Sequence, residues 1–115
     1  MKTYLIIHNV RSLHNVGSIF RTADGAGVSK IYLTGYTPTP HDFFGKLRKD
    51  FAKTALGAEK FVEWEHKKNI SKLLKDLKTS GGLRMGDVFV VSLEQSLHAI
   101  SYDKFKTLYR KKLKK

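Results

Sequence analysis

The sequence of 115 residues contains no cysteine, which excludes a disulfide scaffold and any metal site built on thiolates. It also has no apolar run of about 18 residues, so no membrane-spanning helix is expected. The apolar stretch that follows the first four residues is of strand length and is wrongly flanked for a signal peptide. We therefore expect a cytoplasmic location.

Acidic residues are scarce as well: 10 stand against 22 basic residues, for a net charge of +12 and a pI near 10.0. Such an excess favours a polyanionic partner, most often nucleic acid. Residues 104–115 hold seven basic residues and no acidic one, which leaves 15 basic and 10 acidic residues in 1–103. We therefore divide the chain into a body (1–103) and a basic tail (104–115). Charge alone leaves two alternatives open, a solvated tail and an anionic membrane surface.

Apolar residues recur with strand and helix periods in alternation along the body. A β-branched run at 3–7 predicts a strand, a stripe from Val16 to Ala23 predicts a helix, and 31–33 predicts a second strand. Further segments are a loop with both prolines (37–50), a weak helix (47–58), a strand (61–64), a helix capped by Asn69 (70–77) and a strand (88–91). This order predicts an α/β domain with a parallel sheet.

The segment between the first strand and the first helix is the best candidate site, because ligands bind at the carboxyl ends of strands in open α/β sheets. Asn15 is placed to cap the helix, whose free N–H groups would favour phosphate. Gly17 would let a ligand approach the first turn closely. Arg21 lies one turn later, where its guanidinium could make a forked contact to phosphate, and Arg11 could add a second cation.

Each of these residues also has a plainer structural interpretation. Asn15 is explained by capping alone, Gly17 by tight packing, and Arg21 by a solvated surface position. The sequence shows no dinucleotide fingerprint after a strand, no Walker loop and no nucleophile elbow. It shows no histidine–carboxylate cluster at metal-ligand spacing either, so no metal is expected.

The candidate segment resembles a known family. Residues 9–28, NVRSLHNVGSIFRTADGAGV, are similar to the first motif of the SpoU/TrmH branch of the SPOUT methyltransferases. The resemblance continues in order through KIYLTGYTPTP (30–40), KTALGAEK (53–60), FVEW (61–64) and VVSLEQ (90–95). Together these segments cover most of residues 3–103.

The resemblance implies an S-adenosylmethionine-dependent enzyme, usually a homodimer, that methylates a ribose 2′-hydroxyl of tRNA or rRNA. It implies that Arg21 is the catalytic residue and that Asn15 supports it. Glu94 and Gln95 would lie near the rim of the cofactor site. The residues expected to contact RNA are Asn9, Arg11, Gly17, Arg21 and Thr22.

The sequence departs from the family pattern after residue 103. It lacks the later strand that ends in GNE and the segment resembling SLNV, which form the C-terminal knot and most of the methyl-donor pocket. We therefore expect an incomplete, C-terminally truncated α/β-knot domain with little activity on its own. Two alternatives stay open: a non-catalytic RNA-binding remnant that uses its basic residues, and an unstable gene remnant.

Overall fold

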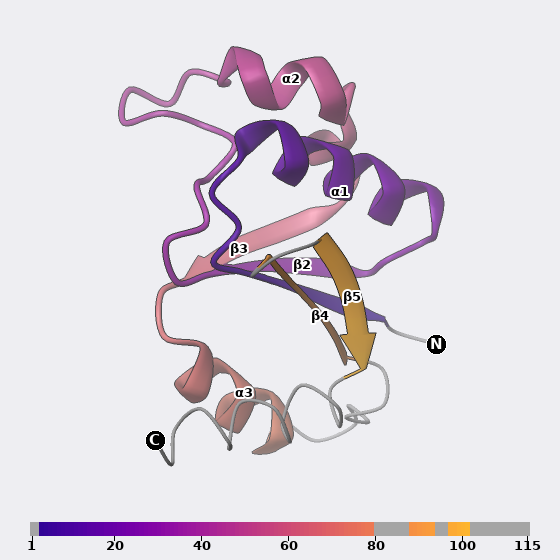
Figure 1. The fold of residues 1–115 in the computed structure, drawn as a ribbon, viewed down its shortest axis with the longest axis vertical. Helices are drawn as coiled ribbons and strands as arrows, with labels where there is room; N and C mark the ends of the chain where they lie inside the picture. The colour runs from indigo at the N-terminus through magenta and orange to yellow at the C-terminus, as the bar shows by residue number, and fades with distance from the viewer. Residues whose placement is uncertain (1–2, 80–87, 94–96, 102–115) are drawn as a thin grey trace.

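The computed structural model describes residues 3–79, 88–93 and 97–101 (Figure 1). Strands and helices alternate through most of this part of the chain, as the apolar periodicity predicts. In order, the elements are β1 (Tyr4–His8), α1 (Leu13–Gly25), β2 (Lys30–Thr34), α2 (Lys49–Ala55), the short 3-10 helix η1 (Ala58–Lys60), β3 (Glu63–Lys67), α3 (Ile70–Thr79), β4 (Val88–Leu93) and β5 (Leu97–Ser101). No helix in these ranges is long and apolar enough to cross a membrane.

The five strands form one sheet in the order β3-β2-β1-β4-β5. The central strand β1 pairs in parallel with β2 and β4, and β2 pairs in parallel with β3. His8, at the end of β1, lies opposite Thr34 on one side and Ser92 on the other. The carboxyl ends of these parallel strands therefore meet at one edge of the sheet, and the predicted α/β class is confirmed.

One edge of the sheet differs from the expectation, because β5 was not predicted and runs antiparallel to β4. Only three residues separate the end of β4 at Leu93 from the start of β5 at Leu97. A parallel crossover needs about a dozen residues or more, whereas an antiparallel pair needs only a short turn. The short connection therefore permits a hairpin and excludes a fifth parallel strand.

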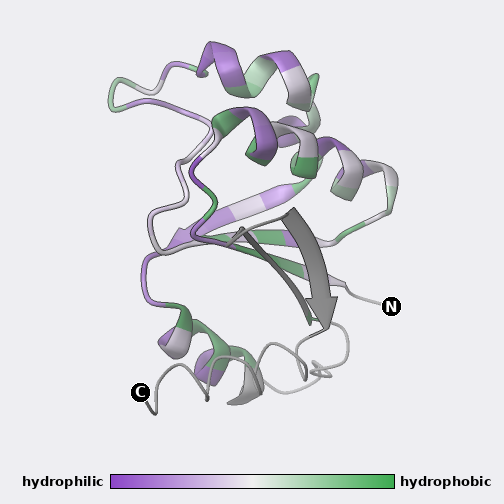
Figure 2. Ribbon diagram, in the orientation of Figure 1, coloured by the Kyte–Doolittle hydropathy of each residue, from purple (hydrophilic) through white to green (hydrophobic). Residues whose placement is uncertain are grey.

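Alternate side chains of the strands supply two separate cores, one on each face of the sheet. Ile7, Ile31 and Leu33 face α1, whereas Ile6 and Tyr32 face α3. Figure 1 shows α1 and α3 on opposite sides of the sheet, and Figure 2 shows that both turn apolar residues toward it. The predicted third helix is confirmed, with its apolar stripe buried beneath the sheet at Ile70, Leu73, Leu74 and Leu77.

The helix α2 forms a further layer on the outer side of α1 (Figure 1). Phe20 of α1 and Phe51 of α2 are both fully buried, and their rings meet edge to face with centroids 5.0 Å apart. Burying each ring stabilises the fold by about 1.5–3 kcal/mol. This pair fixes α2 against α1, and it is the contact that positions the site described below.

Several element boundaries differ from the sequence prediction. α2 begins at Lys49 and ends at Ala55, because Leu56 and Gly57 adopt left-handed backbone angles with φ of 51° and 85°. The strand predicted at 61–64 begins at Glu63 instead, since η1 and its C-cap residue Phe61 occupy the preceding positions. At α3 the predicted cap is confirmed, as Asn69 Oδ1 accepts a hydrogen bond from the Lys72 backbone N–H at 3.0 Å.

Candidate functional site

The start of α1 is capped by Ser12 and not by Asn15. Ser12 has extended backbone angles, and its Oγ accepts a hydrogen bond from the Asn15 backbone N–H at 3.1 Å. Asn15 is the third residue of the helix, so the prediction that it caps α1 is wrong. The sequence contained the correct signal, because a serine three residues before the bonded N–H is the usual capping geometry.

Gly17 is buried where α1 crosses α2. A Cβ at this position would overlap Thr54 Oγ1 and would lie 2.6 Å from the Phe51 carbonyl oxygen. The residue therefore permits the close approach of two helices, which is the packing interpretation that the sequence left open. A ligand cannot reach the first turn through Gly17, because α2 already occupies that space.

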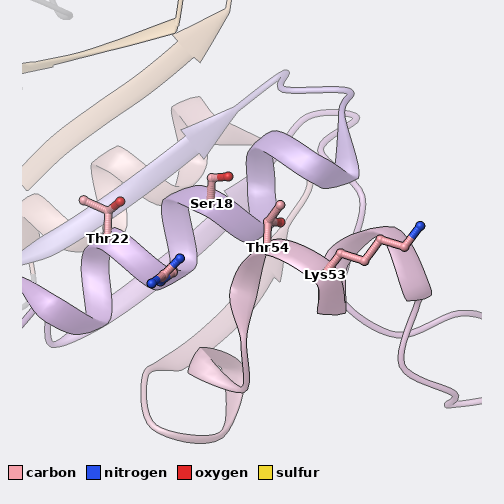
Figure 3. Close-up of a pocket in the computed structure, with 5 residues that line it drawn as sticks. Ser18, Thr22, Lys53 and Thr54 are labelled. Atoms are coloured by element: carbon pink, nitrogen blue, oxygen red, sulfur yellow. The ribbon is translucent and has the colours of Figure 1, made fainter.

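A shallow, open pocket of about 400 Å³ lies beside this helix crossing. Its walls are Ser18, Arg21 and Thr22 from α1 and Lys53 and Thr54 from α2. Figure 3 shows the Ser18 and Thr22 side chains along one side of α1, with Thr54 beside them and Lys53 extending outward from α2. Two of the predicted residues, Arg21 and Thr22, thus lie together in a pocket.

The pocket is lined by two cations, and neither Arg21 nor Lys53 forms an ion pair with another described residue. Arg21 and Lys53 are both exposed, and no carboxylate lines the pocket. The ion pairs that Lys30 and Lys67 form with Glu63 and Glu65 lie on β2 and β3, outside the pocket lining. An arginine fork and an ammonium group that share an open pocket with hydroxyl groups are suited to a phosphate or another oxyanion.

The hydroxyl of Thr54 is already engaged, since it donates a hydrogen bond to the His14 carbonyl oxygen at 2.8 Å. That bond ties α2 to the first turn of α1. Thr54 therefore shapes the pocket wall, and the side chains left to bind a ligand there are those of Ser18, Arg21, Thr22 and Lys53.

The position of Arg21 changes the expected role of the helix start. Arg21 lies eight residues after Leu13, which is about 12 Å along the axis at the usual rise per residue. The free N–H groups of the first turn and the Arg21 side chain are therefore too far apart to bind the same phosphate. A phosphate held by Arg21 gains its charge partner from Lys53 of α2 and little from the helix dipole, which fades within one turn.

The remaining predicted RNA contacts, Asn9 and Arg11, form a second group at the carboxyl ends of β1 and β2. Asn9 has a left-handed backbone with φ of 55°, and its Oδ1 accepts a hydrogen bond from the Tyr36 backbone N–H at 3.2 Å. The Arg11 guanidinium lies over the Tyr36 ring, 5.0 Å from its centroid. Neither residue lines the Arg21 pocket.

The pocket contains two residues that the sequence did not predict as part of the site. Lys53 and Thr54 belong to the pocket but were assigned no role, although their KTALGAEK motif follows the first motif in the order typical of the family. The predicted cofactor residues, Glu94 and Gln95, lie outside the described residues, as does the basic tail.

Comparison with known proteins assigns the family. Residues 2–111 match the model of the SpoU rRNA methylase family. The chain belongs to this family. Its members are RNA methyltransferases, and the resemblance noted in the sequence is thereby confirmed.

Individual relatives agree with the assignment. A TrmH-family tRNA/rRNA methyltransferase of Staphylococcus epidermidis is 33% identical over 79 residues, which cover 69% of this chain and 29% of the relative. A TrmH-family tRNA/rRNA methyltransferase of Staphylococcus aureus is 32% identical over 81 residues, covering 70% and 30% respectively. The chain therefore spans less than a third of the length of these curated relatives.

Solved structures share the fold. An AdoMet-bound rRNA methyltransferase from Sinorhizobium meliloti matches 91% of this chain and 44% of its own, with a TM-score of 0.65 and 20% identity. The TrmH/SpoU tRNA-modifying enzyme of A. aeolicus matches 84% of this chain and 55% of its own, with a TM-score of 0.61 and 22% identity. The described sheet and helices thus correspond to part of a SPOUT methyltransferase fold.

Proposed function

We propose that this chain supplies the RNA-contacting half of an S-adenosylmethionine-dependent RNA ribose 2′-O-methyltransferase. The observation that carries the proposal is the open pocket in which Arg21 and Lys53 stand without a carboxylate, in a chain of the SpoU rRNA methylase family. The proposal keeps tRNA or rRNA as the substrate, a homodimer as the assembly and the cytoplasm as the location.

In this proposal the pocket holds a phosphate next to the target ribose. The Arg21 guanidinium makes a forked contact to two phosphate oxygens, and the Lys53 ammonium group adds a second charge. The hydroxyls of Ser18 and Thr22 donate hydrogen bonds from the same side of α1. Asn15 lies on that side too, at three and seven residues before Ser18 and Thr22, which places it one turn closer to the helix start.

We assign Arg21 a positioning and charge-stabilising role in catalysis. A guanidinium group keeps its proton in proteins and therefore makes a poor base. Holding the phosphate fixes the ribose hydroxyl relative to its reaction partner, and such fixed geometry lowers the activation barrier. Asn15, six residues and nearly two turns before Arg21, supports this role as the family resemblance implies.

The methyl donor does not fit the Arg21 pocket. S-adenosylmethionine carries a positive sulfonium and an adenine ring, whereas this pocket is cationic and lined by hydroxyl groups, with no aromatic wall. The motifs that form most of the donor site in the family are not present in the 115 residues. We therefore derive no step through the donor, and we expect the chain by itself to transfer little methyl.

Substitution at Arg21 tests the proposal. Arg21→Ala should weaken the binding of bulk tRNA by about fivefold to tenfold and reduce the salt slope of the affinity by about one unit, since one phosphate contact is lost. Arg21→Lys should recover part of the affinity, because it restores the charge, but it cannot restore the forked contact to two phosphate oxygens. The matched control is Lys60→Ala, which removes one exposed cation outside the pocket. Equal losses in Arg21→Ala and Lys60→Ala would contradict a specific phosphate site.

A non-catalytic RNA-binding protein is the second candidate, and the cationic pocket without a fit for the donor favours it. Both candidates predict RNA binding, but only the first predicts methylation once the missing donor motifs are supplied by a complementing C-terminal segment. Incubation with tRNA and radiolabelled donor, with and without such a segment from a relative, separates them. Robust turnover by the chain alone would show that the donor site is complete without these motifs.

A further inference from the structure

Two phenylalanines stand almost fully in solvent on the loop between β2 and α2. Phe43 is 95% exposed and Phe44 is 90% exposed, the highest values among the large apolar residues of the described chain. Burying either ring would stabilise the fold by about 1.5–3 kcal/mol, so leaving both rings in solvent brings no gain in stability. Exposed apolar pairs of this kind mark interaction sites.

The turn that carries the two rings is held in one conformation. Asp42 Oδ1 accepts hydrogen bonds from the backbone N–H groups of Phe44 (2.9 Å) and Lys46 (3.0 Å). The Asp42 backbone N–H donates to the Lys46 carbonyl at 2.9 Å, and Gly45 takes the left-handed φ of 81° that the turn requires. The rings are therefore presented before any partner arrives, which lowers the entropic cost of binding.

The base of the loop is anchored to the body of the protein. A β-bridge joins His41 to Leu47, and the Arg48 N–H donates to the carbonyl of the fully buried Pro40 at 2.9 Å. The His41 ring stacks on Trp64 of β3, with centroids 6.0 Å apart and planes 23° apart. These contacts hold the base of the loop against the folded body of the protein, so the position of the tip is fixed relative to the sheet.

The two rings are perpendicular, with centroids 5.6 Å apart and an interplanar angle of 89°. Figure 2 shows the tip of this loop as an apolar end that projects past the helices. The near-complete exposure of both rings leaves ring faces open to a planar group. Unpaired nucleic-acid bases are planar groups of suitable size, and every base can stack in this way.

Positive charges lead from the tip to the Arg21 pocket. Lys46 and Lys49 are exposed, and Lys49 and Lys53 lie four residues apart on one side of α2, about 6 Å along its axis. Lys53 itself lines the pocket. In Figure 1 the loop runs directly into α2, so tip and pocket are joined by a single element. Asp50 interrupts this series of lysines, but the segment 46–53 keeps a net positive charge that matches the phosphates of a strand whose bases reach the tip.

We propose that Phe43 and Phe44 form a stacking platform for unpaired RNA bases, at a distance from the nucleotide held at Arg21. This inference rests on the proposed function. A second copy of the chain is the weaker occupant, because two phenylalanine rings bury about 150–250 Å² each, short of the roughly 800 Å² per partner of a stable interface. The flanking lysines also favour a polyanion over an identical basic surface.

The test compares Phe43→Ser/Phe44→Ser with the matched control Phe61→Ser, which alters another exposed phenylalanine, the C-cap residue of η1. Fluorescence anisotropy measures the affinity of the whole chain for labelled single-stranded RNA and for duplex RNA over a range of salt concentrations. The fluorescence of Trp64, the single tryptophan, checks that the base of the loop is intact.

The double substitution should weaken single-stranded RNA binding by about tenfold, with duplex binding nearly unchanged. The salt slope should stay at the wild-type value because no charge is removed, whereas Arg21→Ala should lower it. Phe61→Ser should bind as the wild type does. Normal RNA affinity in the double variant combined with weakened affinity in Arg21→Ala would overturn the platform and leave the proposed function standing.

Other outcomes identify other occupants. If the wild type binds neither RNA, both the platform and the proposed function are overturned. Sedimentation that shows a wild-type dimer and a monomeric double variant would assign the rings to a second copy. Loss of binding to anionic lipid vesicles in the double variant, with RNA affinity unchanged, would assign them to a membrane surface.

Discussion

Gly17 of α1 lies directly against Thr54 of α2, and the Thr54 hydroxyl reaches past it to the His14 carbonyl oxygen at 2.8 Å. This contact sets how closely the two helices approach. Arg21 lies on α1 and Lys53 lies on α2. The distance between these two pocket residues therefore depends on Gly17, which has no side chain.

Gly17→Ala should therefore destabilise the fold. Overpacking at the helix crossing costs about 1–3 kcal/mol, which the better helix propensity of alanine offsets by about 1 kcal/mol. We expect a net loss of up to about 2 kcal/mol in the free energy of unfolding, measured by urea denaturation with circular dichroism. Gly25→Ala is the control, since no atom lies within 4 Å of a Cβ there and the change should be neutral or slightly stabilising.

Ser12→Ala should cost about 1 kcal/mol of stability, because it removes the acceptor for the Asn15 N–H. Asn15→Ala should leave the unfolding free energy within about 0.5 kcal/mol of the wild type, since alanine has the better helix propensity and the capping bond uses only the Asn15 backbone. Thermal melts of the two variants provide the comparison. A larger loss for Asn15→Ala than for Ser12→Ala would restore the capping role predicted from the sequence.

Lys53→Ala should weaken tRNA binding by about threefold to tenfold and reduce the salt slope by about one unit, as expected for a lost phosphate contact. Combining it with Arg21→Ala should give less than the sum of the two losses in binding free energy if both cations hold one phosphate. Additive losses in this double-mutant cycle would indicate two separate contacts.

The ion pairs of Glu65 with Lys30 of β2 and Lys67 of β3 should make the stability of the fold slightly sensitive to acid. Hydrogen bonds from Lys67 and then Lys30, at 2.9 and 3.0 Å, lower the pKa of this carboxyl below its ordinary value of 4.5. A lowered folded-state pKa means that the stabilisation is complete above about pH 4.5 and is lost as the pH falls through the folded value. The effect is about 0.5 kcal/mol or less, because the side chain is 41% exposed and screened by solvent.

Glu65→Gln isolates this contribution. The difference in unfolding free energy between wild type and variant should be measurable near neutral pH and should shrink toward zero as the pH falls from 4.5 through the lowered pKa of Glu65. Glu63→Gln is the matched control, because Glu63 is 73% exposed and its contact to Lys30 is longer, at 3.7 Å. A difference between wild type and Glu65→Gln that grew toward low pH would reverse the assigned sign.

The sequence was most informative where a local rule acts on neighbouring residues. The continuous β-branched run at 3–7 is typical of a buried strand, and the stripe of α3 has a clear period of 3.6 residues; both elements form close to where these patterns predict. β5 could not be found in this way, because its pairing with β4 depends on a short connection and not on a pattern within Leu97–Ser101. The cap of α1 was misplaced because Ser12 and Asn15 are both good capping residues.

The sequence by itself determined the class of the fold, the family and the choice of Arg21 and Thr22, because these follow from periodicity and from an ordered series of motifs. Only the tertiary structure decided which residues stand together. It placed Lys53 and Thr54 beside Arg21, buried Gly17 and set Asn9 and Arg11 apart. The physical reason is that α2 packs on α1 through Phe20 and Phe51, a contact between segments about thirty residues apart that no local pattern encodes.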